Sequence, residues 1–391
     1  MKKYNLILIA AIIVAMTGFY SCDKEVTEPD QKPGDELPPG PGDGSVSNPF
    51  KVFTVEDLKR VGSDEVGPGG FKWECNKNYR QMADIDLRTV QSWTPLCNGY
   101  NKPFSGTYEG NGKTISNLKI LGEGKDVGLF AEVSGTVRNV RLTNIDITGS
   151  NNVGGIAGLT SIHSNALIDH CYVNIIDLSG TGSKGNSDIG GIVGCFYSGT
   201  ISNCIVTGEN IRTTTLSNTG GIAGINYSMI TNCYVSANVR GYFIVGGIVG
   251  SNEPNAIVQY CYVSGEVSAE NSFLGGISGT CHPNGNIQNC VALSRELKKN
   301  DPNGLSQYIG RICSDDNLSN NYARSDMKLW NNANSVVPSS TDNTSRHGAD
   351  ISSSDYNSAS WWKNTAGFPD ENWSFDDNRL PWLKGFDGLP Q

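Results

Sequence analysis

Gly220-Gly221-Ile222-Ala223-Gly224 decides how this chain folds, because the same motif recurs in four other places. The glycine pairs that open the five copies are Gly154 and Gly155, Gly190 and Gly191, Gly220 and Gly221, Gly246 and Gly247, and Gly275 and Gly276. A second short motif with a central cysteine follows each copy. These cysteines are Cys171, Cys204, Cys233, Cys261 and Cys290, at steps of 33, 29, 28 and 29 residues. Such regular self-similarity is the signature of a repeat architecture.

Each repeat offers two short β-branched runs separated by Gly, Asn, Ser and Thr, which is typical of strands and turns. One unit cannot bury its apolar face alone, whereas stacked units can. Degenerate copies at Val127-Gly128-Leu129-Phe130 and Ile309-Gly310-Arg311-Ile312 flank the five full ones. We therefore predict an all-β protein, a right-handed parallel β-helix (β-solenoid) of about seven coils with capped ends.

Stacking also predicts what the repeated residues do. The glycine pairs should allow tight turns and close approach of the backbone. The five repeat cysteines should form an inward ladder with Cβ atoms about 4.8 Å apart, longer than the roughly 3.8 Å that a disulfide needs. We expect buried free thiols, with bridges between coils as the alternative. Cys75 and Cys97 lie outside the ladder, and the sequence leaves open whether they form a disulfide.

At these residues the sequence resembles the GLUG-repeat family of bacterial surface proteins, named for a Gly-Leu-hydrophobic-Gly core. Ile takes the Leu position in the five full copies, and Gly128-Leu129-Phe130 is closer to the name. Residues 83–87 and 104–115 are similar to the segment that opens such solenoids. The resemblance covers about residues 48–325 and implies the architecture. It implies no single activity, because the family supplies adhesin-like proteins and accessory regions of surface proteases.

Residues 1–21 have the layout of a secretory signal, with two lysines followed by an apolar run from Leu6 to Met16. They resemble a bacterial lipoprotein signal, which implies that Cys22 is lipidated. Residues 22–47 are rich in Pro, Gly and acid and predict a disordered tether. Acid after Cys22 is similar to the surface-export signal of Bacteroidetes-type lipoproteins. We expect an outer-membrane lipoprotein at the cell surface; a periplasm-facing lipoprotein and an uncleaved membrane anchor are the alternatives.

Further regions follow the tether. Residues 48–103 predict an N-terminal cap with entry strands, in which Thr54 opens a capping box and a helix to about Val61. Residues 104–325 hold the solenoid repeats. Residues 326–391 contain Trp330, Trp361, Trp362, Trp373 and Trp382 and predict a cap packed on the final coil. An aromatic platform for sugar rings is the other interpretation of these tryptophans.

The sequence predicts no catalytic residue, cofactor or metal site. It has no Cys-x-x-Cys spacing, and His163, His170, His282 and His347 form no His-Glu-x-x-His pair. His170 and Cys171 should face opposite ways and make no catalytic pair. The repeat acids are Asp146, Asp169, Asp177, Asp188, Glu209, Glu266 and Glu270. They do not share a register, so we expect mostly solvated turn residues and no carboxylate pair across neighbouring coils.

The net charge of the chain is −9, and removing the +2 of Lys2 and Lys3 leaves −11. This excludes nucleic acid as a partner, and we expect membrane contact only through the lipid. Our leading hypothesis is a monomeric, non-enzymatic, adhesin-like protein that presents its solenoid to a glycan or protein ligand. A structural scaffold and a carbohydrate-active enzyme on the same fold are the alternatives. Inserted turns at about 177–188 and 208–219 are candidates for the binding face.

Overall fold

The computed structural model describes residues 40–182, 187–301, 308–315 and 318–389. The chain divides into two units, Met1–Pro38 and Pro39–Gln391, and all described residues lie in the second. The signal region, Cys22 and most of the tether therefore fall outside the described residues. None of the helices within the described ranges has the length and hydropathy needed to cross a membrane.

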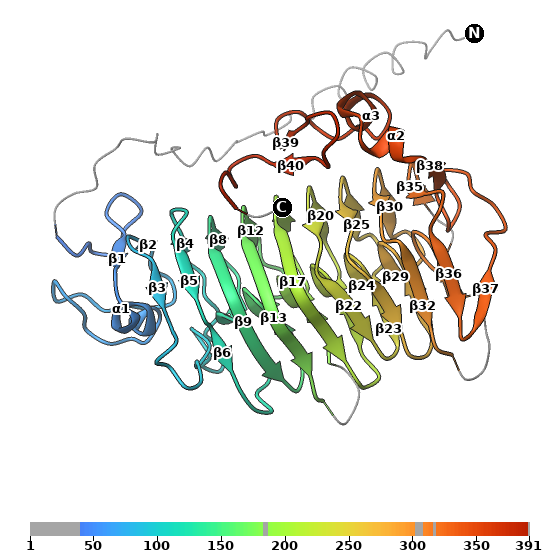
Figure 1. Cartoon of the computed structure of the whole chain (residues 1–391). Coiled ribbons are helices and arrows are strands. Elements are labelled where there is room, and N and C mark those ends of the chain that lie inside the picture. Colours follow the sequence, from blue (N-terminus) through green and yellow to red (C-terminus); the bar gives the residue numbers. More distant parts are fainter. Residues whose placement is uncertain (1–39, 183–186, 302–307, 316–317, 390–391) are drawn as a thin grey trace, which may run out of the picture. The chain divides into compact units, whose positions relative to one another are not determined.

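The second unit is built around a parallel β-solenoid (Figure 1). One sheet stacks a strand from every coil, and all of its neighbouring strands are parallel. Its strands are β1 (Phe50–Val52), β2 (Tyr79–Gln81), β4 (Thr107–Glu109), β8 (Thr136–Arg138), β12 (Leu167–Asp169), β16 (Thr200–Ser202), β20 (Met229–Thr231), β25 (Ile257–Gln259), β30 (Asn286–Gln288) and β34 (Leu318–Ser319). The predicted β-solenoid is confirmed.

The ten strands of this sheet show that the prediction of about seven coils was too low. Seven coils contain the glycine corner, which lies in a sheet of six strands extended by a bridge from Val127 to Val153. The six strands are β10 (Val153–Gly154), β14 (Ile189–Gly190), β18 (Asn218–Gly220), β23 (Ile244–Gly246), β28 (Phe273–Gly275) and β33 (Ile309–Gly310). β1 and β2 begin two coils at the N-terminal end, and β34 begins the last. These three coils lack the glycine motif, so a count of motifs misses them.

Two further sheets complete each coil. The strands that follow the glycine corner are β7 (Phe130–Val133), β11 (Ala157–Thr160), β15 (Val193–Phe196), β19 (Ala223–Asn226), β24 (Val249–Asn252) and β29 (Ser278–Cys281). The largest sheet contains β3 (Ile85–Asp86), β5 (Thr114–Ser116), β6 (Lys119–Ile120), β9 (Arg141–Gly149), β13 (Tyr172–Gly180), β17 (Ile205–Thr213), β21 (Tyr234–Val235), β22 (Asn238–Gly241), β26 (Tyr262–Val263), β27 (Val267–Ala269), β31 (Val291–Ala292), β32 (Glu296–Lys299), β35 (Tyr322–Arg324), β36 (Lys328–Asn331), β37 (Asn334–Val336) and β38 (Ala349–Ile351).

The glycine corner is crowded by backbone of its own coil and of the next coil. A Cβ on Gly221 would lie 2.2 Å from the carbonyl oxygen of Gly247, and a Cβ on Gly220 would lie 2.1 Å from that of Ala223. No L side chain fits such a contact, so the motif requires glycine for lack of space. Ile222 follows the pair and is fully buried in the core.

A second corner precedes each repeat cysteine, where one residue adopts a left-handed conformation with φ between +49° and +54°. Asn tolerates this conformation better than most residues, which explains the recurring Asn-Cys pair. The corner residues are Asn139, His170, Asn203, Asn232, Tyr260, Asn289 and Asn320. The cysteine that follows points inward, and all five repeat cysteines are buried free thiols.

We expect the free thiols to resist alkylation in the native protein. The described residues contain eight of them, namely Cys171, Cys195, Cys204, Cys233, Cys261, Cys281, Cys290 and Cys313. Burial raises the pKa of Cys233 and Cys261 well above the ordinary value, which suppresses the reactive thiolate. Peptide mass mapping after iodoacetamide treatment should find all eight unlabelled before denaturation and labelled afterwards without reductant. Peptides bridged between repeat cysteines would contradict this arrangement.

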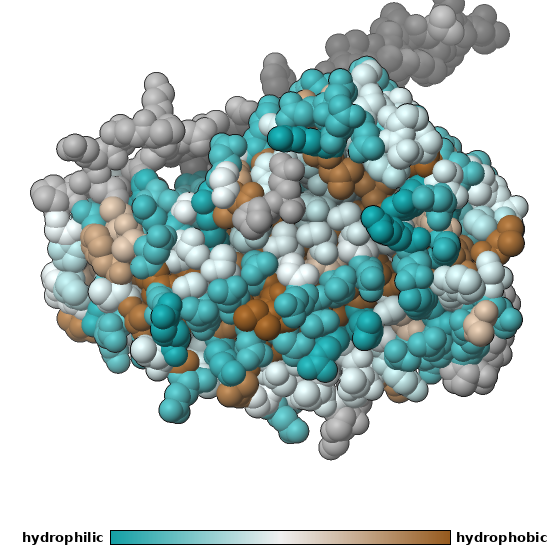
Figure 2. Space-filling model, in the orientation of Figure 1, coloured by the Kyte–Doolittle hydropathy of each residue, from teal (hydrophilic) through white to brown (hydrophobic). Residues whose placement is uncertain are grey.

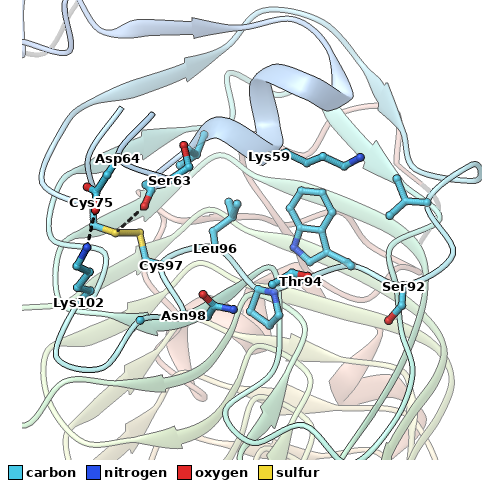
Figure 3. A pocket seen from close by; sticks show the side chains of 16 residues that line it. Lys59, Ser63, Asp64, Cys75, Ser92, Thr94, Leu96, Cys97, Asn98 and Lys102 are labelled. Carbon is cyan, nitrogen blue, oxygen red and sulfur yellow. Dashed lines mark hydrogen bonds and ion pairs between the residues drawn. A yellow bond between two sulfur atoms is a disulfide. The ribbon is translucent and has the colours of Figure 1, made fainter. Parts of the chain in front are cut away.

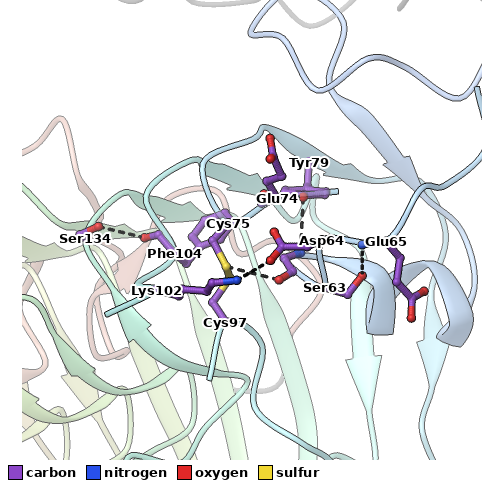
Figure 4. Close-up of a disulfide and its surroundings, with 11 residues drawn as sticks. Ser63, Asp64, Glu65, Glu74, Cys75, Tyr79, Cys97, Lys102, Phe104 and Ser134 are labelled. Atoms are coloured by element: carbon purple, nitrogen blue, oxygen red, sulfur yellow. Dashed lines mark hydrogen bonds and ion pairs between the residues drawn. A yellow bond between two sulfur atoms is a disulfide. The ribbon is translucent and has the colours of Figure 1, made fainter. Parts of the chain in front are cut away.

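The N-terminal end begins earlier than the sequence indicates. Residues 40–47 were assigned to the disordered tether, but they pair with the first coils: Lys51 N donates to Pro41 O and Asn78 N donates to Gly44 O. These backbone bonds order the segment, so that assignment was wrong for residues 40–47. The capping box of Thr54 is confirmed, and it opens α1 (Val55–Arg60). Cys75 and Cys97 form a disulfide with Cα atoms 6.0 Å apart (Figure 4).

At the opposite end, Arg311 replaces the second glycine of the motif and fills the last corner. Its guanidinium is buried and donates to the carbonyl oxygens of His347 and Gly348, each at 2.9 Å, and it pairs with Asp350. The antiparallel pair of β36 and β37 and the parallel strand β38 close this end. The chain then continues through α2 (Ser353–Tyr356), α3 (Ala359–Asn364), β39 (Trp373–Ser374) and β40 (Trp382–Leu383).

Candidate functional site

Residues 352–389, which we name the C-terminal strap, run back along the flank of the solenoid (Figure 1). They cover a row of outward side chains that are register partners in successive coils. The row is Tyr172, Ile205, Tyr234, Tyr262, Val291 and Tyr322. Trp362, Phe368 and Trp373 of the strap are buried against this row and form a second hydrophobic cluster with it.

Hydrogen bonds tie the strap to coils well before the last one. Trp373 Nε1 donates to Asn232 Oδ1 at 3.1 Å, Tyr262 Oη donates to Pro381 O at 2.6 Å, and Asn289 Nδ2 donates to Ala366 O at 2.9 Å. Residues 326–351 close the C-terminal end as predicted for the cap, but the prediction that the whole segment packs on the final coil was wrong for residues 352–389, which extend over earlier coils. The reason is the row of tyrosines, which is apolar enough to bind the strap along the flank. The rings of Trp362 and Trp373 are buried, so these two tryptophans offer no face to a sugar ring.

His170 and Cys171 face opposite ways. The His170 ring stacks on Phe386 of the strap, with ring centroids 6.1 Å apart, while Cys171 is buried in the core. His170 Nδ1 lies 2.6 Å from Asp169 Oδ2. Burial alone would raise the pKa of Asp169, but hydrogen bonds from His170, Ser202 and Asn203 lower it below its ordinary value. The Ser202 hydroxyl donates its hydrogen bond to Asp169. In a hydrolytic triad the serine hydroxyl donates to the histidine instead.

One carboxylate pair does share a register, contrary to the prediction. Asp146 in β9 and Asp177 in β13 are direct partners in neighbouring coils. The coil of Asp146 has no cysteine, so counting from the cysteines misses this alignment. Each carboxylate has its own cation: Lys119 Nζ lies 2.9 Å from Asp146, and Arg212 binds Asp177 through two contacts of 2.7 and 2.9 Å. The pair is thus part of a network of ion pairs along the coils.

Asp188 is not a solvated turn residue either. It is buried at the start of β14 and accepts a hydrogen bond of 2.8 Å from Asn218 Nδ2. Burial raises the pKa of Asp188 to about 6. The neighbouring positions in the same row are Asn152 and Asn218, as their registers show. Asp188 is therefore a buried acid in a row that otherwise holds amides.

We expect Asp188→Asn to stabilise the protein above pH 6. A raised pKa means that the folded state binds the proton more tightly, so the wild type loses stability as the pH rises from about 4 through about 6. The difference between about 6 and the ordinary 3.8 corresponds to at most about 3 kcal/mol. Urea unfolding between pH 4 and pH 8 should show this pH dependence weakened in the variant. The control is Asp177→Asn, which should not become more stable above pH 6. If the stability of the wild type and of Asp188→Asn depended equally on pH, Asp188 would not be the buried acid that causes the loss.

A surface with a regular pattern of outward side chains lies on the long strands of the largest sheet, beside the strap. We name it the ladder face and define it by two rows of outward side chains. One row is Lys119, Asp146, Asp177, Asn210, Asn238, Glu266, Glu296 and Lys328, and the other is Thr148, Ser179, Arg212, Arg240, Ser268, Lys298 and Trp330. Residues between the rows, such as Ile211 and Val239, point into the core.

Hydrophilic side chains predominate in the view of Figure 2. The two inserted turns partly belong to the ladder face, because residues 177–180 and 208–213 lie in β13 and β17. Residues 183–186 of the first turn fall outside the described residues. Leu216 in the second turn is 55% exposed, as the sequence predicts for a solvated turn.

Among the residues that the structure describes, no group of three His, Cys, Asp or Glu side chains could hold a metal.

The stacked coils and the glycine repeats define a β-solenoid repeat protein. Residues 215–240 match the family model of the GLUG motif. The chain is 33% identical over 171 residues to halomucin of Haloquadratum walsbyi, a match that covers 41% of this chain and 2% of halomucin. The chain therefore spans only a small part of that relative.

A crystal structure from Bacteroides ovatus has the same fold. It is described as that of a candidate immunoglobulin A1 protease and superposes with a TM-score of 0.60 at 25% identity. The match covers 88% of this chain and 94% of that one. The likeness thus extends over nearly the full length of both chains.

Proposed function

We propose that this protein is a non-enzymatic, adhesin-like binding protein of the bacterial cell surface. It presents its solenoid to a glycan or protein ligand. The observation that carries the proposal is the ladder face, where polar and charged side chains repeat from coil to coil outside the strap. A regular array of this kind suits an extended ligand, which can contact equivalent side chains in successive coils.

The contacts of the candidate catalytic groups support binding over catalysis. Asp146 and Asp177 are held by separate cations, and His170 is held between Asp169 and the strap. Catalytic acids and bases need free lone pairs or protons aimed at a substrate. In these residues the reactive atoms make contacts within the protein instead.

Peptide-bond cleavage is the second candidate function, favoured by the full-length likeness to the Bacteroides ovatus chain. A serine protease would need a serine hydroxyl that is hydrogen-bonded to a histidine. A zinc protease would need at least three His, Cys, Asp or Glu side chains close enough together to bind one zinc ion. Neither arrangement occurs among the described residues. The described contacts therefore favour binding.

We place the protein at the outer membrane through a lipid on Cys22. The export signal and the acidic tether that follows it support this placement. Cys22→Ser should move the protein out of the membrane fraction in its native bacterium. Retention of the variant after carbonate washing would favour an uncleaved anchor.

The ligand can be found with an array that carries both glycans and extracellular-matrix proteins. The full chain should be retained by at least one class of ligand. Arg240→Glu combined with Lys298→Glu reverses two exposed charges of the ladder face and should weaken that binding at least about tenfold. Lys125→Glu reverses an exposed charge outside both rows and should leave binding unchanged. Retention by no ligand would count against the proposed function, and equal effects of both variants would exclude the ladder face.

A further inference from the structure

The N-terminal end of the solenoid contains a cavity that the repeats do not form. Its volume is about 530 Å³, and residues 59, 61–64, 75, 90, 92–99 and 102 line it (Figure 3). Sites for small ligands usually measure roughly 300–1,000 Å³. We name this cavity the N-terminal bowl.

The bowl has an apolar floor and a polar rim. Val90 and Pro95 are half-buried and give the floor its accessible apolar surface, while Val61, Trp93 and Leu96 also line it but are almost fully buried. The exposed rim carries the hydroxyl groups of Ser92 and Thr94, the amide of Asn98, and charged groups from Lys59, Asp64 and Lys102. An apolar surface with convergent hydrogen-bonding groups suits a saccharide, whose ring has apolar faces and a polar edge.

The walls of the bowl are held in place by contacts of their own. The disulfide joins Cys75 to Cys97, and Lys102 Nζ donates to Asp64 Oδ2 at 2.5 Å (Figure 3). Asp64, Cys97 and Asn101 all have positive φ values, between 52° and 64°. Non-glycine residues persist in this conformation only where the surroundings hold them, and such strain gathers at ligand sites. The bowl is therefore preorganised.

The charge of the lining differs from that of the protein. The lining contains the ammonium groups of Lys59 and Lys102 and the carboxylate of Asp64, so it carries two minus one, or +1, in a chain of net charge −9. Asp64 pairs with Lys102, and Lys59 lies on the other side of the bowl (Figure 3), so the charge of Lys59 is the one left for a ligand. The hydrogen bond to Asp64 raises the pKa of Lys102, which keeps the ammonium charged. An anionic ligand group would thus meet a local positive charge.

An aromatic ring stands beside the rim. Tyr100 is 94% exposed and lies in the loop between Asn98 and Lys102, which line the bowl. It is the most exposed of the large hydrophobic residues in the described chain. A tyrosine ring that packs against nothing in its own protein is available to a ligand, and such rings are frequent in binding sites.

We propose that the N-terminal bowl binds the terminal acidic sugar of a glycan. The ring lies on the apolar floor, its hydroxyl groups bond to Ser92, Thr94 and Asn98, and its carboxylate pairs with Lys59. This deepens the proposed function, because it names a ligand class for a surface binding protein. No residue of the ladder face lines the bowl, so each site can be tested with its own variants.

Methyl glucuronoside and methyl glucoside differ by one carboxylate and are suitable probes. In titrations of the full chain followed by NMR, methyl glucuronoside should bind at least about tenfold more tightly than methyl glucoside. Lys59→Glu should remove this preference, and Tyr100→Ala should weaken binding several-fold. Both residues are exposed, so neither variant should unfold the protein. Lys125→Glu is the matched control and should bind like the wild type.

Equal binding of the two glycosides, or unchanged binding of the acidic glycoside to Lys59→Glu, would overturn the assignment of the bowl. So would the absence of binding to methyl glucuronoside. Array binding that depends on the ladder face would survive each of these outcomes and keep the proposed function. Conversely, a protein that binds methyl glucuronoside but is retained by no array ligand would keep the bowl and overturn the proposed ladder-face function.

Discussion

Ile222→Asp should unfold the central coils of the solenoid. Ile222 is fully buried, its N–H donates to Ile248 O at 2.8 Å, and its carbonyl accepts from Ile192 N at 3.0 Å in the coil before. A carboxylate at this position has no partner and no water, so it must bind a proton or force the coil open. We expect a loss of at least about 4 kcal/mol in the free energy of unfolding, beyond the range of most substitutions. Thermal denaturation and limited proteolysis near residues 208–240 would measure the effect.

The same substitution at Leu216 is the control. Leu216 lies six residues earlier in the exposed turn between β17 and β18. A new carboxylate there remains in water, so the free energy of unfolding should change by no more than about 0.5 kcal/mol. A similar drop in melting temperature for both variants would show that the inserted turn is packed, and it would remove that turn from the binding face.

Trp373→Ala should release the C-terminal strap while the coils stay folded. The indole of Trp373 is buried between Phe368 and Tyr262, with ring centroids 5.2 and 5.6 Å away, and it bonds to Asn232. Removing a buried tryptophan costs about 3–5 kcal/mol, which is large for a segment of this size. Hydrogen exchange should show loss of protection in residues 352–389 and newly exposed backbone along β21 and β26.

Phe71→Ala is the control for the strap, because Phe71 is a large hydrophobic residue that is already exposed. Its hydrogen exchange pattern should match that of the wild type. If Trp373→Ala instead lowers protection equally in the core strands, the strap and the solenoid unfold as one cooperative unit. That result would contradict the separate opening expected here.

The glycine motif predicts the solenoid because five copies at nearly equal steps leave few other ways to bury Ile222 and its equivalents. The coils that begin with β1, β2 and β34 could not be counted, since their residues lack the motif. The position of the strap could not be predicted either. It depends on a row of tyrosines in neighbouring coils, and their outward direction follows only from the strand register.

Less of the candidate sites than of the fold could be predicted from the sequence. The alignment of Asp146 with Asp177 could have been found by comparing the coils through Val140 and Cys171, which occupy equivalent corners. The disulfide of Cys75 and Cys97 could be named only as an open possibility. The N-terminal bowl combines residues from α1 and from the loops around that disulfide, and no spacing pattern links them before the chain is folded.

A binding protein leaves its ligand chemically unchanged, and this can be measured directly. The purified full chain is incubated with each ligand that it retains on the array, and with immunoglobulin A1, and every mass is then determined by mass spectrometry. We expect retained ligands of unchanged mass and intact immunoglobulin A1 after prolonged incubation. Cleavage products that form in proportion to the concentration of this protein would contradict the proposed function.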